Sequence, residues 1–192
     1  MEHNAADDRY PDQVRAGRPR RAEVESAVRR ATADLVSAQG YAGTSLDQIA
    51  RAAGVAKTTV YRRWASKSEL ALDVLVETLG TPPAPEGDVE PGLRATIGWL
   101  ADQIGRRGVY HLLTGLVSEA ARDTEVRRGL RERIRTPFAE RVEAAWGVAP
   151  DQTDLAFDVV VGTLLHHAAL AGGMDGRVVE TITGVAVGLV KP

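Results

Sequence analysis

Hydrophobic positions recur every three or four residues along most of the chain, which is the spacing of one face of an α-helix. Residues 22–39 illustrate the pattern: alanines, valines and a leucine form one apolar stripe, and Gly40 follows as a helix terminator. No strand-like alternation longer than four residues is convincing. The pattern therefore predicts an all-α chain of about nine helices.

Four helices are expected in the first eighty residues, over about 22–39, 45–53, 57–64 and 66–79. The second begins at a capping box made either by Ser45 with Gln48 or by Thr44 with Asp47. Ser66, followed by Lys67-Ser68-Glu69, makes the same kind of start for the fourth helix.

Proline and glycine mark where helices cannot run. Residues 81–88, TPPAPEGD, forbid a helix and predict a linker. Beyond it, helices are expected over 91–106, 108–122, 124–146, 151–171 and 175–190. Pro137 lies inside the third of these, where it predicts either a kink that opens room for a ligand or a plain break between two shorter helices.

The expected organisation has five parts. Residues 1–20 should form a disordered arm with a basic end, and residues 21–66 a three-helix unit. A connecting helix over 67–80 and a linker over 81–90 then lead to a second helical domain over 91–192.

Composition narrows the class of protein. The 192 residues suffice for a sizeable core, and the absence of cysteine excludes disulfides, thiolate metal sites and cysteine nucleophiles. The polar start is unlike a secretory signal, and the longest uncharged stretch, residues 159–174, is too short and too polar for a membrane span. A cytoplasmic protein without a membrane partner is expected.

The net charge is −2, but positive and negative charges are distributed unequally along the chain. Residues 15–67 carry eleven Lys/Arg against four acids, a charge of +7, whereas residues 68–192 carry twelve against eighteen, a charge of −6. A basic segment joined to an acidic one indicates that only the first meets a polyanion.

Two short helices joined by a turn that contains glycine form the helix-turn-helix unit. Ala50 is small enough for the helices to approach closely, and Gly54 supplies the positive φ of the turn. Ile49, Val55 and Val60 are expected to be buried between the helices. The second helix then offers polar side chains to a DNA major groove. These are Lys57, Thr58, Thr59, Tyr61, Arg62 and Arg63.

Residues 41–72, YAGTSLDQIARAAGVAKTTVYRRWASKSELAL, resemble the DNA-binding segment of the TetR family of transcriptional repressors. The matching positions are Thr44, Ile49-Ala50, Ala53-Gly54-Val55, Lys57, Thr59, Tyr61, an aromatic at Trp64, and Ser66-Lys67 before Leu70. The remainder of the chain is similar to the family only in its helical layout. The resemblance implies an N-terminal helix-turn-helix domain followed by a helical ligand-binding and dimerisation domain.

Two positions depart from the family's usual pattern. Ala56 stands where the family usually has Ser, and the missing cap hydroxyl costs about 1 kcal/mol at the start of this helix. Trp64 replaces the commoner Phe, which keeps the position aromatic and apolar.

The resemblance also implies roles in DNA binding. Tyr61 should contact the sugar-phosphate backbone, and Lys67 and the helix start at Thr44 and Ser45 should touch flanking phosphates. Arg18, Arg20 and Arg21 are expected to reach a minor groove, as basic arms do. Base edges and phosphates are expected for Lys57, Thr58, Thr59, Arg62 and Arg63. The alternative is that these charges form a solvated face.

The last two expected helices are apolar nearly all the way round, so each needs a partner on every side. They look like the helices that in the TetR family form a four-helix bundle between two subunits. The expected homodimer interface comprises Leu155, Val159, Gly162, Leu164, Ile182, Val185 and Leu189. An ordinary core within one subunit is the alternative.

Candidates for an effector pocket are the few aromatic residues of the second domain and their neighbours. The seven main candidates are Trp99, Tyr110, Leu113, Phe138, Val142, Phe157 and His166, and Trp146 and His111 are further ones. Sparse aromatics and the lack of an inward acid cluster argue against a polycationic drug and favour a small apolar effector, neutral or anionic. Plain core is the alternative for each residue.

No catalytic residue, metal site or cofactor is expected. The chain lacks the G-x-S-x-G, H-E-x-x-H, G-x-x-x-x-G-K-[ST] and G-x-G-x-x-G motifs. His166 and the adjacent His167 diverge by about 100° on a helix, so they cannot grip one ion. The resemblance to the TetR family implies a ligand-released repressor that binds a palindromic operator as a dimer, with activation by the ligand as the alternative direction. Its rival is a helical binding module without sequence-specific DNA binding.

Overall fold

The computed structural model describes residues 21–190, and all regular elements there are helices. They are α1 (Arg21–Gln39), α2 (Leu46–Ala52), α3 (Lys57–Tyr61), α4 (Lys67–Leu79), α5 (Val89–Gly105), α6 (Arg107–Ala120), α7 (Thr124–Leu130), the π-helix η1 (Arg131–Arg135), α8 (Thr136–Trp146), α9 (Pro150–Ala171) and α10 (Gly176–Val190). Because α7, η1 and α8 are consecutive, residues 21–190 form nine helical rods, which confirms the all-α prediction. The expected arm, with Arg18 and Arg20, lies outside the described residues.

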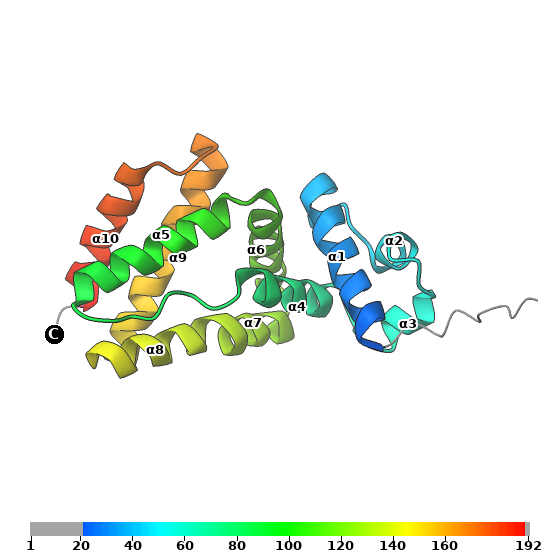
Figure 1. The fold of residues 1–192 in the computed structure, drawn as a ribbon, viewed down its shortest axis with the longest axis horizontal. Coiled ribbons are helices and arrows are strands. Elements are labelled where there is room, and N and C mark those ends of the chain that lie inside the picture. Colours follow the sequence, from blue (N-terminus) through cyan, green and yellow to red (C-terminus); the bar gives the residue numbers. More distant parts are fainter. Residues whose placement is uncertain (1–20, 191–192) are drawn as a thin grey trace, which may run out of the picture.

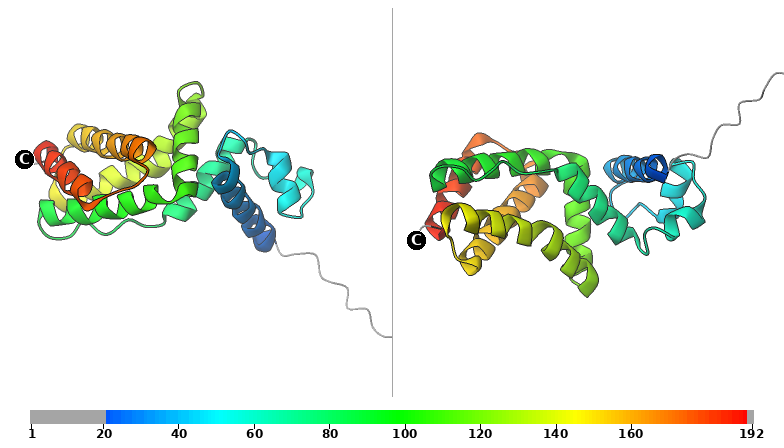
Figure 2. Two further views of the ribbon diagram at one scale, coloured as in Figure 1. Left: turned by 90° about the horizontal axis from the view of Figure 1, so that it is seen from above. Right: turned by 60° about the horizontal axis from the view of Figure 1, so that its bottom comes forward.

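The helices form two packed groups. Helices α1–α3 lie at one end of the molecule, α5 and α8–α10 lie at the other, and α4 and α6 lie between them (Figure 1). Two further views show the same separation (Figure 2). Both α1 and α4 pack on α6, and α4 also contacts α7. Buried side chains form one continuous core from Val28 in α1 to Val190 in α10, so packing joins the groups as well as the chain itself.

Local signals explain the short helices of the first group. Ser45 caps α2, because its hydroxyl accepts from the Gln48 N–H and the Gln48 side chain accepts from the Ser45 N–H at 2.8 Å. Of the two boxes that the sequence allowed, this is the one that forms. Gly54 adopts φ +67° in the turn after α2. The third helix ends at Tyr61, earlier than expected.

The segment around Pro137 is a continuous helical run with one widened turn. The π-helix η1 immediately precedes α8, and Pro137 lies in the first turn of α8. Proline has no N–H to donate back along the helix, and the widened turn directly before it accommodates the missing hydrogen bond. The structure therefore favours a local distortion of one helix over a plain break.

Helices α9 and α10 pack on each other and on α5. Leu164 is 0% exposed and Ile182 is 4% exposed, so both belong to the core of their own subunit. This corrects their expected place in a dimer interface, since their side chains have no surface left for a partner. Among the described residues, α9 is the one helix long and apolar enough to cross a membrane, and 17% of its most apolar stretch is buried in the subunit.

Candidate DNA interface and effector pocket

Helix α3 buries one face and exposes the other. Val60 of α3 and Ile49 of α2 are 0% exposed, and the two helices pack together. On the opposite side Thr58 and Arg62 are exposed and Tyr61 is 51% exposed. This arrangement lets a short helix enter a major groove while its other face stays anchored.

The exposed surface of α3 is partly neutralised by α2. Lys57 Nζ forms an ion pair with the Asp47 carboxylate, and the Tyr61 hydroxyl donates to the same carboxylate at 3.4 Å. The hydrogen bond from Lys57 lowers the pKa of the Asp47 carboxyl below its ordinary value. Arg62, in contrast, has no carboxylate partner within residues 21–190. Arg62 is therefore available to DNA without first losing an ion pair.

Arg63 and Lys67 are held by neighbouring groups. Arg63 Nη2 lies 3.1 Å from Glu25 Oε2 of α1. Lys67 Nζ donates to the Tyr41 carbonyl oxygen at 3.0 Å and lies 4.0 Å from the centroid of the Tyr41 ring. Thr59 is half-buried. A phosphate contact by Arg63 or Lys67 thus requires an exchange of partners.

The start of α2 uses its own polar side chains. The Ser45 hydroxyl serves the capping box, and Thr44 is 3% exposed with its hydroxyl donating to Gly40 O at 2.9 Å. The N–H groups of Leu46 and Asp47, in the first turn, have no partner within the helix. The expected phosphate at this helix start therefore stays a prediction that rests on backbone N–H groups.

Asp73 of α4 joins three separate segments. Its Oδ2 accepts a hydrogen bond from Trp64 Nε1 at 2.7 Å, and its Oδ1 lies 2.8 Å from Arg133 Nη1 of η1. Arg29 of α1 approaches the same carboxylate at 3.7 Å. One carboxylate therefore links the end of the helix-turn-helix, α1 and the widened π turn.

Tyr41 connects helices α1–α3, the candidate DNA-binding group, to α6. Its side chain is 8% exposed, its hydroxyl donates to the Glu119 carboxylate, and its ring lies so close to Gly115 that a Cβ there would overlap it. Burial, reinforced by Glu119, raises the pKa of Tyr41 above its ordinary value. The phenol therefore stays protonated and remains a donor.

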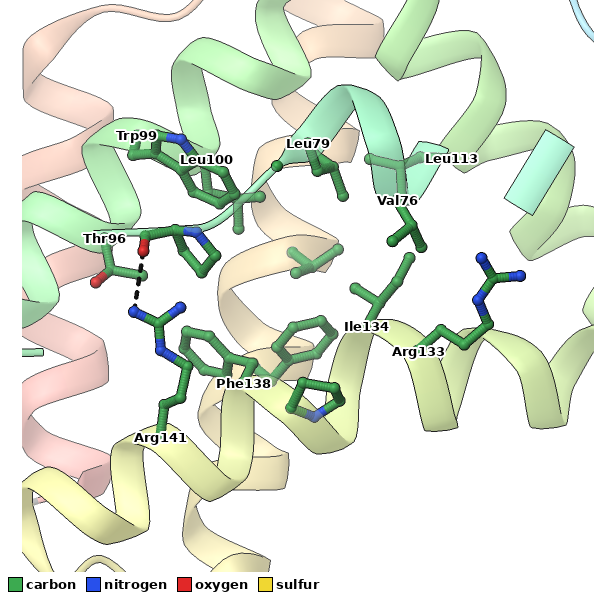
Figure 3. A pocket seen from close by; sticks show the side chains of 15 residues that line it. Val76, Leu79, Thr96, Trp99, Leu100, Leu113, Arg133, Ile134, Phe138 and Arg141 are labelled. Atoms are coloured by element: carbon green, nitrogen blue, oxygen red, sulfur yellow. Dashed lines mark hydrogen bonds between the residues drawn. The ribbon is translucent and has the colours of Figure 1, made fainter. Parts of the chain in front are cut away.

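A cavity of about 150 Å³ lies where α4, α5, α6, α8 and α9 meet (Figure 3). Its wall comprises Val76, Leu79, Gly80, Pro82, Thr96, Trp99, Leu100, Leu113, Arg133, Ile134, Pro137, Phe138, Arg141, Phe157 and Val161. The rings of Phe138 and Phe157 pack with centroids 5.4 Å apart. The wall is largely apolar, so it suits a small ligand with an apolar body.

The structure brings together four of the seven expected pocket residues, namely Trp99, Leu113, Phe138 and Phe157. Val142 lines a smaller neighbouring cavity of about 20 Å³. Tyr110 does not reach the larger cavity, and its ring packs edge-on against His111. His166 is exposed on α9. Tyr110 and His166 are therefore removed from the candidate ligand site.

A helix-turn-helix with an exposed basic face, joined through α4 to a helical domain with an apolar cavity, defines the class of DNA-binding transcriptional regulators. The sequence comparison is more particular. Residues 28–74 match the family model of bacterial regulatory proteins, tetR family. Residues 28–74 thus carry the DNA-binding segment of the TetR family of transcriptional regulators.

Similar proteins cover the length of the chain. The DNA-binding transcriptional repressor TetR of Mycobacteroides abscessus is 29% identical over 182 residues, 87% of this chain and 96% of its own. The TetR-family member SCO1917 from Streptomyces coelicolor A3 has a TM-score of 0.68 at 21% identity, over 88% of this chain and 99% of that one. The multidrug binding protein EbrR, complexed with ethidium, has a TM-score of 0.69 at 20% identity, over the same shares. The structural similarity thus extends well beyond the DNA-binding segment.

Sequence reasoning missed the residues that connect the two groups. Asp73 stands alone as a charge in the apolar run LALDVLV, which was a usable signal for a buried partner. Arg133, Pro137 and Arg141 recur every four residues, which places both arginines on the proline face of one helix. Attention to that spacing would have added both arginines to the pocket candidates.

Proposed function

We propose that the protein is a cytoplasmic repressor that binds a palindromic operator as a homodimer and leaves it when a small effector enters the cavity. The observation that carries the proposal is the position of α4. Asp73 ties this helix to Trp64 at the DNA-binding group, and Val76 and Leu79 of the same helix line the cavity. A change in the shape of the cavity therefore acts on a helix that is tied to Trp64, just after α3.

The outward faces of α9 and α10 support the homodimer. Leu155 and Leu170 of α9 are 53% and 76% exposed, and Val185 of α10 is 49% exposed. Gly162 and Gly184 have open space at their Cβ positions, so another helix can approach them closely. Val159 and Leu189, also expected in the interface, are half-buried. Two such helices from each subunit form a four-helix bundle that covers these side chains.

Two-fold symmetry explains how α4 controls DNA binding. A symmetric dimer reads half-sites about 34–36 Å apart, or a multiple of that distance. A pivot of α4 changes the separation of the two α3 helices. An effector that favours another separation lowers DNA affinity by its differential affinity for the two states, typically about 1–3 kcal/mol.

The similarity to EbrR supports the effector role of the cavity. EbrR is a multidrug binding protein, and its fold matches 88% of the length of this chain. The cavity of this chain is apolar and borders α4. The proposal gives it a small, largely apolar occupant.

Selection of binding sites from a random DNA pool tests the DNA-binding part. A palindromic consensus is expected. Arg62→Ala should weaken binding by about tenfold and relax one base preference, because an arginine on a base edge contributes about 1–3 kcal/mol of discrimination. Arg122→Ala removes the same charge beyond the end of α6 and should leave affinity unchanged. Failure to enrich any sequence would contradict the proposal.

Reciprocity tests the release step. A compound shown to bind the free dimer should bind the operator complex more weakly, by the same factor by which it lowers operator affinity. Calorimetric titration of the protein with and without a short operator duplex measures both affinities. Equal affinities would exclude release by that compound.

A further inference from the structure

The two arginines that line the cavity are satisfied in different ways. Arg133 Nη1 pairs with Asp73 Oδ1 at 2.8 Å. Arg141 Nη2 donates to the carbonyl oxygens of Pro82 at 2.9 Å and Pro83 at 3.0 Å. No acid is among the cavity-lining residues, and Arg141 has no carboxylate partner within residues 21–190. The Arg141 guanidinium is thus a half-buried charge without a counter-ion in the described part of the chain.

The geometry of Arg141 leaves room for a second partner. A guanidinium has five N–H donors, and both hydrogen bonds of this side chain use Nη2. The donors on Nε and Nη1 have no acceptor within residues 21–190. The guanidinium lies beneath the linker at the edge of the cavity, beside Phe138 (Figure 3). Because arginine pairs with carboxylates through planar, charge-assisted hydrogen bonds, an anionic group suits this place.

The rest of the cavity determines the body of the ligand. Trp99, Phe138 and Phe157 supply aromatic surfaces to its wall. Its volume of about 150 Å³ is that of apolar protein cavities that accept a benzene molecule. Aromatic rings pack well against one another in offset and edge-to-face arrangements. A single ring therefore suits the cavity better than a long alkyl chain.

We propose that the effector is a small aromatic carboxylic acid, bound as its anion. Its carboxylate binds Arg141, and its ring lies among Trp99, Phe138 and Phe157. The inference rests on the proposed function, since it assigns a class of ligand to the same cavity.

Arg141 also connects such a ligand to α4. Pro82 and Pro83, whose carbonyl groups it holds, follow α4 in the chain just after Gly80. A carboxylate on the Nε and Nη1 donors shares this guanidinium with the linker carbonyls, and a charge-assisted hydrogen bond is roughly twice as strong as a neutral one. Binding of the acid therefore repositions the guanidinium that also holds the linker where it leaves α4.

Isothermal titration calorimetry of the full-length protein with three probes of nearly equal shape tests the inference. The probes are phenylacetate, phenylacetamide and phenethylamine. The acid should bind at least about tenfold more tightly than the amide, because only the acid offers a charge to Arg141. The amine should bind more weakly than either. Cyclohexylacetate tests the ring, and it should bind more weakly than phenylacetate.

Two variants locate the carboxylate. Arg141→Met keeps the apolar stem and removes the charge, and it should abolish the preference for acid over amide. Arg131→Met removes an equal charge from an exposed position outside the cavity and should keep that preference. If Arg141→Met does not fold by circular dichroism, the order of the probes on the wild-type protein decides the matter.

The outcomes separate this inference from the proposed function. Equal binding of acid and amide, tighter binding of the amine, or no binding of phenylacetate up to its solubility limit would overturn the inference. Retention of the acid preference by Arg141→Met would overturn the assignment of the anchor. Acid binding that depends on Arg141 but leaves operator affinity unchanged supports the inference and rejects release by ligand.

Discussion

The Asp73 carboxylate is shared by groups that come from three parts of the chain. It accepts from the indole of Trp64, whose side chain is 2% exposed, and it pairs with Arg133 of the cavity wall. Removing the charge leaves the guanidinium without its partner and weakens the hydrogen bond of a buried indole. A partly buried donor that loses a charged acceptor is costly because water cannot replace the acceptor fully.

Asp73→Asn should therefore lower the free energy of unfolding by about 1–3 kcal/mol. It should also reduce the effect of a bound ligand on operator affinity, because Arg133 no longer connects the cavity to Trp64. Denaturant titration gives the first quantity, and operator binding with and without ligand gives the second. Glu77→Gln is the matched control: Glu77 is 63% exposed and pairs with Arg29, so its loss should change stability by less than about 1 kcal/mol. Equal effects of the two substitutions would contradict this role of Asp73.

At the scale of elements, α3 has little local support. It has five residues, and its N-cap residue Ala56 makes no side-chain hydrogen bond. The backbone of Ala56 is extended, with φ −65° and ψ 139°, which is the conformation an N-cap residue adopts. Packing of Val60 rather than capping therefore holds this helix in place.

Ala56→Ser should stabilise the protein by about 0.5–1 kcal/mol, because its hydroxyl can accept from a free N–H of the first turn. Chemical denaturation measures the gain. Ala52→Ser, at an exposed site at the end of α2, introduces the same side chain without a cap and should be neutral or slightly destabilising. A gain at Ala52 as large as that at Ala56 would indicate a cause other than capping.

The elements that could be predicted are those with local signals. The capping box of Ser45 and the turn at Gly54 are written in neighbouring residues, so α2 and the turn followed from the sequence. Periodicity also identified α9 and α10 as apolar on all sides. Periodicity does not show which side of each helix faces the rest of its own subunit. Leu164 is buried within the subunit, whereas Leu155 is exposed. The pairing of Asp73 with Arg133 joins distant segments, and no local pattern encodes it.

For the molecule as a whole, the proposed dimer depends on the exposed apolar faces of α9 and α10. Leu155→Glu combined with Val185→Glu should convert the dimer to a folded monomer, because both side chains are about half exposed in the single subunit. Sedimentation velocity measures the assembly, and circular dichroism the fold. Val117→Glu is a matched control, since Val117 is 50% exposed on α6 and should leave the dimer intact. A wild-type protein that sediments as a monomer at micromolar concentration would refute the proposal.

Leu164→Ala separates assembly from folding. Leu164 is 0% exposed within one subunit, so the substitution should destabilise the fold by about 2–5 kcal/mol through lost packing. Thermal unfolding of the double variant Leu155→Glu, Val185→Glu provides the comparison. A loss of dimer without loss of subunit stability in Leu164→Ala would restore this residue to the interface.

The contact between helices α1–α3 and α6 depends on the absence of a side chain at Gly115. A Cβ at this position would overlap the Tyr41 ring, so Gly115→Ala should force α6 and the DNA-binding group apart and cost about 1–3 kcal/mol. Operator affinity should fall as well, because α1 and α4 both rest on α6. In Gly98→Ala the new methyl group meets open space, and the variant should gain about 0.5–1 kcal/mol from helix propensity. A stable Gly115→Ala variant with normal operator affinity would show that neither stability nor operator binding requires the close contact between Tyr41 and Gly115.

The continuous core has a consequence for recombination between relatives. The segment α1–α4 rests on α6 through Tyr41 and Gly115, and on the π turn through Asp73. A chimera that joins α1–α4 of this chain to the second domain of another regulator contains only one of the two partners of each contact. Such a chimera should fold, and its operator affinity should respond to a ligand, only when α6 and η1 come from the same chain as α1–α4. The unit of exchange is therefore larger than the helix-turn-helix, and its boundary lies within the second helical domain.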